Sequence, residues 1–237
     1  MSSPHDLIHA RALGHLNHYI KPARREVLGP HCNVQFDDDA DLARLKGFLT
    51  AHPMCEVTKW LAALHEAGHF VAYERLGFLA GTAEIGESGG GHACPWAPPI
   101  YSYPLAPDDF LRDAQAVLAG PIAEELLGGG DLLGSSIGEL IDAAIRSRRA
   151  ADLAGRDSIE MWDETLLGAV ALIEHHKPEI LDIAAVLERE GCIWRTNSAV
   201  NKILMRVEEA PIDMRAVSER GLALADRINE ALREFAR

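Results

Sequence analysis

The chain has 237 residues, 48% of them hydrophobic, which suits one large domain or two small ones with a sizeable core. Its formal net charge of −13 argues against nucleic acid or an anionic membrane as the main partner. No apolar run reaches the length of a membrane span, and the first residues lack the hydrophobic core of a signal peptide, so we expect a cytoplasmic protein. The four cysteines have no CxxC spacing and are expected to be free thiols.

Residues 1–54 are predicted to form a polar, helical N-terminal extension, followed by one domain over residues 55–237. His5 and His9 have a spacing that could suit a metal, but the position between them at which a zinc peptidase carries its catalytic glutamate holds no glutamate. We therefore interpret these histidines as solvent-facing. The extension could serve as a regulatory or docking element.

A helix is predicted over residues 55–76, and it carries the pattern His-Glu-x-x-His. Residues four apart lie on one face of a helix, so His65 and His69 can present two imidazoles to one zinc ion. Glu66 follows the first of them and can accept a proton from a water on that metal. Gly68 costs helix stability relative to alanine, which indicates that another element packs closely there. The pattern is typical of the core of a zinc metallopeptidase.

The stretch from 77 to 107 is rich in glycine and proline and differs from its helical surroundings. We expect a short strand over residues 81–85, then a turn, then an irregular segment that contains Trp96, Tyr101 and Tyr103. These aromatic side chains could line a cleft in which an extended substrate adds a strand to the sheet, or they could cap the core.

Helical patterns resume over residues 109–127 and from about 135 to 153. The remainder, residues 158–237, is predicted to be helix-rich, with breaks near Pro178, Gly191 and Pro211. A basic cluster within the second of these helices is interpreted as a solvated face; it comprises Arg146, Arg148 and Arg149. The expected fold class is mainly α with a small β element.

A hydrolytic zinc usually takes three protein ligands, and the motif supplies only two. A carboxylate must therefore come from elsewhere in the chain. The residues alone leave several candidates open: Glu124, Glu125, Asp131, Glu139 and Asp142.

Three segments resemble the peptidase domain of the FtsH-type ATP-dependent zinc proteases: HEAGH at 65–69, LAGPIAEELLGG at 118–129 and GSSIGELIDAA at 134–144. The stretch 164–190 is similar to the family's C-terminal helices, and the resemblance covers roughly residues 55–205. It implies a helical, zincin-like metallopeptidase domain. It also places Glu139 on the family's third zinc ligand, an aspartate, with Asp142 one helical turn later as its competitor.

The chain departs from the family in three respects. Glu139 is longer than the family's aspartate, and Pro121 replaces an arginine, which fits a proline near a helix start. Third, the nucleotide-binding pattern GxxxxGK[ST] is absent from these residues, so we expect neither the family's ATPase module nor its membrane anchor. We therefore expect a stand-alone peptidase that cuts unfolded or exposed segments, or one that works with a separate partner or as a homo-oligomer.

The leading hypothesis is a soluble zinc-dependent endopeptidase that acts on protein or peptide substrates. Zn²⁺ is held by His65, His69 and Glu139, and Glu66 is the general base. Two alternatives remain: a dedicated regulatory protease that cuts one partner protein, and a catalytically inert metal-binding interaction module.

Overall fold

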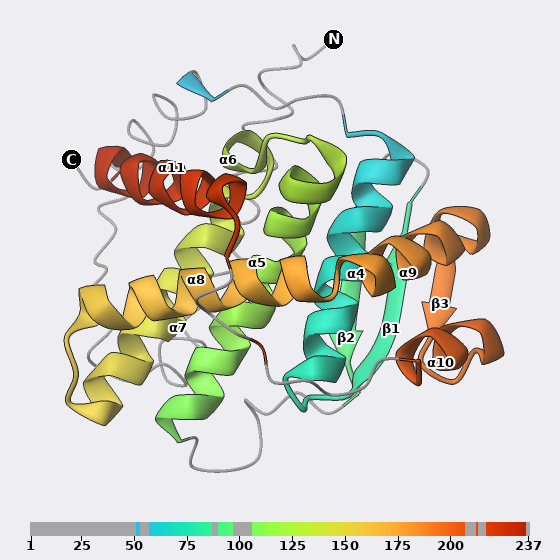
Figure 1. The fold of residues 1–237 in the computed structure, drawn as a ribbon, viewed down its shortest axis with the longest axis horizontal. Helices are drawn as coiled ribbons and strands as arrows, with labels where there is room; N and C mark the ends of the chain where they lie inside the picture. The colour runs from blue at the N-terminus through green and yellow to red at the C-terminus, as the bar shows by residue number, and fades with distance from the viewer. Residues whose placement is uncertain are drawn as a thin grey trace, which may run out of the picture.

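The computed structural model describes residues 51–52, 57–86, 90–96, 106–206, 212 and 217–235, which form the helices and the small sheet of Figure 1. The helices are α4 (Lys59–Arg75), α5 (Pro107–Gly128), α6 (Leu132–Ser135), α7 (Ile137–Ala154), α8 (Ser158–His175), α9 (Lys177–Glu190), α10 (Ser198–Leu204) and α11 (Glu219–Phe235). The strands are β1 (Ala80–Ile85), β2 (Gly91–Pro95) and β3 (Cys192–Trp194). The prediction of a mainly α fold with a small β element is confirmed for this part of the chain. Apart from residues 51 and 52, the predicted N-terminal extension lies outside it.

The central helix α4 is enclosed by other elements along most of its length. The Thr58 hydroxyl caps its start by accepting a hydrogen bond from the Leu61 N–H at 3.1 Å. Between Ala62 and Ala72 every residue except His65 is buried, because α5, α9 and two strands pack around the helix. Gly77 follows the helix with a φ of 85°, a conformation that glycine adopts without strain. The predicted helix is thus confirmed from Lys59 onward.

The sheet has three antiparallel strands in the order β2-β1-β3. In its register, Ala83 of β1 lies opposite both Ala93 of β2 and Ile193 of β3. Strands β1 and β2 both contact α4, and Ala83 and Ile85 are buried while Glu84 on the opposite face is exposed. The strand predicted over residues 81–85 is confirmed, whereas β3 was not predicted.

Helices α5 and α7 form an antiparallel pair, and α5 also packs along α4 (Figure 1). A left-handed glycine ends each of the two helices, Gly129 after α5 and Gly155 after α7. Both helices match their predicted ranges closely. The interpretation of Pro121 as a residue near a helix start is wrong, because it lies buried in the interior of α5. The helix begins instead at Pro107, where a proline has no N–H to lose.

The C-terminal part is helix-rich, as predicted. The break near Pro178 separates α8 from α9, and Gly191 ends α9 in a left-handed conformation. The break predicted near Pro211 lies outside the described residues. Helix α11 packs on α8, where the Trp162 indole N–H donates to the Asn229 side-chain oxygen at 2.7 Å. In the described part of the chain, no helix is long and apolar enough to span a membrane.

Candidate metal centre

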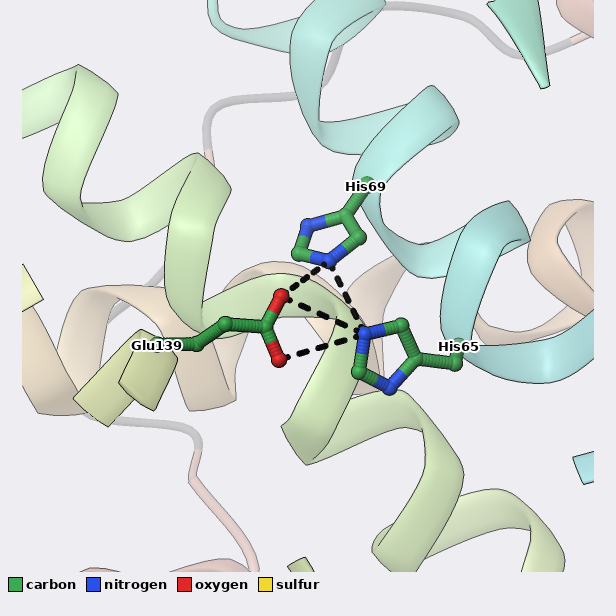
Figure 2. A group of neighbouring side chains, drawn as sticks. All are labelled: His65, His69 and Glu139. Atoms are coloured by element: carbon green, nitrogen blue, oxygen red, sulfur yellow. Dashed lines mark hydrogen bonds and ion pairs between the residues drawn. The ribbon is translucent and has the colours of Figure 1, made fainter. Parts of the chain in front are cut away.

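The side chains of His65 and His69, from α4, and of Glu139, from α7, converge on one point (Figure 2). The Nε2 atoms of the two imidazoles are 3.1 Å apart. The Glu139 carboxylate lies 3.0 Å from His69 Nε2 and 3.3 Å from His65 Nε2. One donor atom from each residue lies within 4.8 Å of the others, so the three could hold one metal ion. The histidines meet because they lie four residues apart on one helix, as predicted.

The outer nitrogen of each imidazole has its own partner. His69 Nδ1 lies 2.8 Å from the backbone oxygen of Ala116, which can only accept, so this nitrogen carries a proton. His65 Nδ1 lies 3.0 Å from the Glu124 carboxylate, to which it donates in the same way. In neutral imidazoles, both Nε2 atoms are then left with a lone pair directed at the meeting point. Partners of this kind orient the imidazoles of metal-binding histidines and strengthen them as ligands.

The donor set favours a cation at the meeting point. With both Nδ1 atoms protonated, the two Nε2 atoms and the Glu139 oxygen are all hydrogen-bond acceptors, which repel one another unless they share positive charge. Burial lowers the pKa of His65, but the Glu139 and Glu124 carboxylates outweigh this effect and raise it well above its usual value. Burial likewise raises the pKa of Glu139, but the two imidazoles outweigh it and hold the pKa far below normal. These residues therefore fit a divalent metal ion.

The choice among the five candidate carboxylates is clear in the structure. Glu139, in the first turn of α7, is the one that reaches both histidines. Asp142, its predicted competitor, lies one turn later and accepts a hydrogen bond from Arg146 at 2.7 Å. Glu124 contacts the far side of the His65 ring, so its position is that of a supporting group. The other two candidates have partners away from the histidines: Glu125 pairs with Arg227 of α11, and Asp131 caps α6.

Glu66 lies beside this group with a buried carboxylate. Its residue is 5% exposed, and its Oε2 atom has no hydrogen-bond partner among the described residues. Burial raises the pKa of Glu66, and the imidazoles of His65 and His69 offset only part of the effect. A carboxylate with a raised pKa and an unpaired buried oxygen is suited to accept a proton from a ligand that enters the site.

Two glycines allow the elements of the site to approach one another. A β-carbon on Gly68 would lie 2.5 Å from the Ala119 backbone oxygen, so the close packing predicted at this position is confirmed and its partner is α5. A β-carbon on Gly120 would overlap the His69 imidazole, because this ring lies directly against the α5 backbone. Sequence reasoning did not single out Gly120. Gly120 lies within a continuous buried run of α5 that begins at Ala116, and nothing in the local sequence indicated that His69 would contact it.

Strand β2 runs next to Glu66 at the edge of the sheet. A β-carbon on Gly91 would lie 2.8 Å from both Cγ and Oε1 of Glu66, so the strand backbone lies against this carboxylate. At the other end of β2, Trp96 is 70% exposed and does not cap the core. Tyr101 and Tyr103, named with Trp96 as possible cleft residues, lie outside the described residues. The same holds for His5 and His9.

A buried ionic group lies behind the candidate metal centre. The Arg146 guanidinium donates to the Asp113 carboxylate of α5 and to the Asp142 carboxylate of its own helix, and all three residues are at most 7% exposed. Burial lowers the pKa of Arg146, but the two aspartates outweigh it and hold the pKa above its usual value. The interpretation of the basic cluster as a solvated face is therefore wrong for Arg146, because Asp113, 33 residues earlier, pairs with it inside the fold.

Comparison with known proteins does not identify the chain: no family model and no curated protein matches it. The chemistry of the site therefore carries the functional assignment.

Proposed function

We propose that this protein is a zinc-dependent endopeptidase whose metal ion is held by His65, His69 and Glu139. The observation that carries the proposal is the convergence of two imidazole nitrogens and one carboxylate beside the buried carboxylate of Glu66. Two histidines with one carboxylate are a usual ligand set for catalytic zinc, which keeps a further position for water or substrate. A structural zinc site, by contrast, is usually closed by four protein ligands.

Each side chain has a definite part in the proposed reaction. A zinc ion held here would supply Lewis acidity toward a peptide carbonyl and toward water. Glu66 accepts a proton from the attacking water and later gives it to the leaving amine. Glu124 and the Ala116 carbonyl hold the two imidazoles in the tautomer that leaves Nε2 free to bind.

The FtsH-type resemblance supports the same reading. Its three segments supply the groups that meet in space: the motif helix, Glu124 as the supporting carboxylate, and Glu139 in the place of the family's ligand aspartate. We propose a zincin-like peptidase domain on this basis. An extended substrate would lie along the edge of β2; the approach of the Gly91 backbone to Glu66 supports this part of the proposal.

The proposal is tested by metal analysis and by hydrolysis of casein, with wild type compared to Glu66→Gln. We expect about one zinc per chain in both proteins, and hydrolysis reduced by roughly 100- to 10,000-fold in the variant, the usual contribution of a general base. Glu84→Gln is the matched control, because Glu84 is exposed on the opposite face of the sheet.

Three other results are informative. Undiminished hydrolysis by Glu66→Gln would exclude the proposed mechanism. Zinc binding without hydrolysis of casein or of a peptide library would favour the inert metal-binding module. Cleavage of one partner protein, with no activity on casein, would identify a dedicated regulatory protease.

A further inference from the structure

The buried ionic group of Arg146, Asp113 and Asp142 joins the two helices that support the metal centre from outside α4. Arg146 and Asp142 belong to α7, and Asp113 belongs to α5. The Arg146 guanidinium is within hydrogen-bond distance of both carboxylates, one through each terminal nitrogen. It therefore forms a directional link between the helices, which apolar packing alone does not provide.

The same face of α5 carries this link and the groups that hold the histidines. Asp113, Ala116, Gly120 and Glu124 follow one another at intervals of three or four residues, so they line one side of the helix. Ala116 and Glu124 contact the outer nitrogens of the imidazoles, and Gly120 accommodates the His69 ring. Any shift of α5 along its axis would move all of these groups together.

The same relation holds on α7. Glu139, Asp142 and Arg146 lie at intervals of three and four residues on one face. Arg146 follows Glu139 by two turns, about 10 Å along the helix axis at 1.5 Å per residue. The link at Arg146 thus joins α7 to α5 two helical turns from the point at which Glu139 reaches the histidines of α4.

We propose that Arg146 is a positioning residue for the metal centre: by binding Asp113 and Asp142 it holds α7 in the register with α5 that brings Glu139 to His65 and His69. The inference rests on the proposed metal site but not on peptide hydrolysis. Glu139 is the one ligand that does not come from the motif helix, so its position depends on helix packing rather than on local geometry. A ligand displaced by one ångström binds a metal ion poorly, because the metal–ligand distances are short and narrowly defined.

Two neighbouring observations agree with this role. The rings of His69 and Tyr73 are stacked, with centroids 6.4 Å apart, and Tyr73 is close enough to Asp113 and Arg146 for their charges to affect its ionisation. The ionic group therefore lies near the Tyr73 ring, which stacks on the imidazole of His69. The Arg146 guanidinium also binds one carboxylate on each of the two helices, so the link involves α5 and α7 directly.

The test compares Arg146→Met with Arg75→Met. Arg75 of α4 forms another arginine–carboxylate link, to Glu179 of α9 at 2.5 Å. Its guanidinium also donates to the Leu204 carbonyl of α10, so these bonds tie α4 to α9 and α10 rather than to α5 and α7. Zinc affinity is measured by competition with a chelating dye, the electronic absorption of the Co²⁺-loaded protein reports the coordination geometry, and urea unfolding of the metal-free protein reports stability.

We expect both variants to lose stability, but only Arg146→Met to lose metal affinity. Its dissociation constant for zinc should rise about 10- to 100-fold, the usual range for groups that position metal ligands, and its Co²⁺ spectrum should change. Arg75→Met should bind zinc within about twofold of wild type and keep its spectrum, since a supporting group is not removed. Equal losses of affinity in the two variants, or wild-type affinity in Arg146→Met, would overturn the inference.

Asp142→Asn provides a milder variant in case Arg146→Met does not fold. It keeps the shape of the side chain and leaves the Arg146–Asp113 pair in place. We expect a smaller rise in the zinc dissociation constant, about 3- to 10-fold; an unchanged constant and Co²⁺ spectrum would count against the inference. A wild-type protein that binds no zinc would remove the proposed metal site itself, whereas zinc binding without hydrolysis would leave the role of Arg146 standing.

Discussion

The carboxylates on the two sides of helix α4 have different partners. On the side of α9 and β3, each carboxylate has a guanidinium: Glu179 pairs with Arg75, and Glu74 pairs with Arg195. On the side of α5 and α7, the carboxylates of Glu124 and Glu139 contact the imidazoles of His65 and His69 instead.

This difference separates a structural use of buried charge from a binding use. Where carboxylates and guanidiniums match one to one, the charges neutralise each other and the helices are tied together. Where the carboxylates contact imidazoles whose outer nitrogens are already engaged, no permanent positive charge balances them, and the balance depends on a proton or a bound cation. A bound cation would balance the negative charge of such an arrangement. Four substitutions test this contrast between the two sides of α4.

The largest effect is expected at Gly120, which leaves room for the His69 imidazole on the side of α4 that faces α5 and α7. Gly120→Ala places a methyl group on the His69 ring and displaces it, so zinc affinity should fall by about 100-fold or more, beyond the effect of a supporting group. Gly128→Ala is the matched control, because its β-carbon would meet only the flexible ends of Leu61 and Leu64. Zinc titration measures the affinity of both variants. Equal affinities of Gly120→Ala and Gly128→Ala would mean that His69 is not a ligand.

On the side of α4 that faces α9 and β3, we expect a substitution to lower the stability of the fold rather than its zinc affinity. Glu179→Gln leaves the half-buried Arg75 guanidinium without its ionised partner, and we expect the free energy of unfolding to fall by about 3 kcal/mol. Urea unfolding of the metal-free protein measures this loss, and zinc affinity should stay unchanged. A large loss of zinc affinity in Glu179→Gln would show that the two sides of α4 are not independent.

Glu124 should show the opposite pattern. Glu124→Gln weakens the group that orients His65, so we expect zinc affinity to fall by about 10-fold. Metal-free stability should change by less than about 1 kcal/mol, because the substitution also removes one of several crowded negative charges. Glu125→Gln, one residue later and facing α11, is the control for zinc affinity. A stability loss as large as that of Glu179→Gln would contradict the proposed contrast.

The smallest effect concerns the pH dependence of Glu74. Burial raises its pKa, but the hydrogen bonds from Arg195 and from the Ala80 N–H outweigh it and hold the pKa below its usual value of 4.5. Because the folded pKa is lowered, the stabilisation is complete above pH 4.5 and is lost as pH falls through the folded value. Glu74→Gln should therefore cost about 1 kcal/mol at pH 7, a figure reduced for solvent screening.

Urea unfolding at a series of pH values tests this sign. The difference between wild type and Glu74→Gln should shrink steadily as the pH is lowered below 4.5. Glu84→Gln, at an exposed position on the neighbouring strand, should show little difference at any pH. A Glu74 difference that stays constant down to pH 3 would mean that its ionised form is not what stabilises the fold.

Local features of the chain were predictable because they depend on residues close in sequence. The spacing of His65 and His69 on one helix, the strand at 81–85 and the helix ends at Gly129 and Gly191 all follow from backbone geometry over a few residues. The short strand β3 escaped prediction, because three residues carry no periodic pattern and form a strand only through pairing with β1.

The sequence by itself determined the two histidines, Glu66 beside them and a short set of carboxylates that could complete the site. Only the tertiary structure decided between Glu139 and Asp142, since both lie on the same face of α7 one turn apart. Asp113 of α5 engages Arg146, which also binds Asp142, and Glu139 is left facing the histidines. The physical reason is that a local pattern sets which face of a helix a side chain occupies, whereas its partner depends on how distant helices pack against that face.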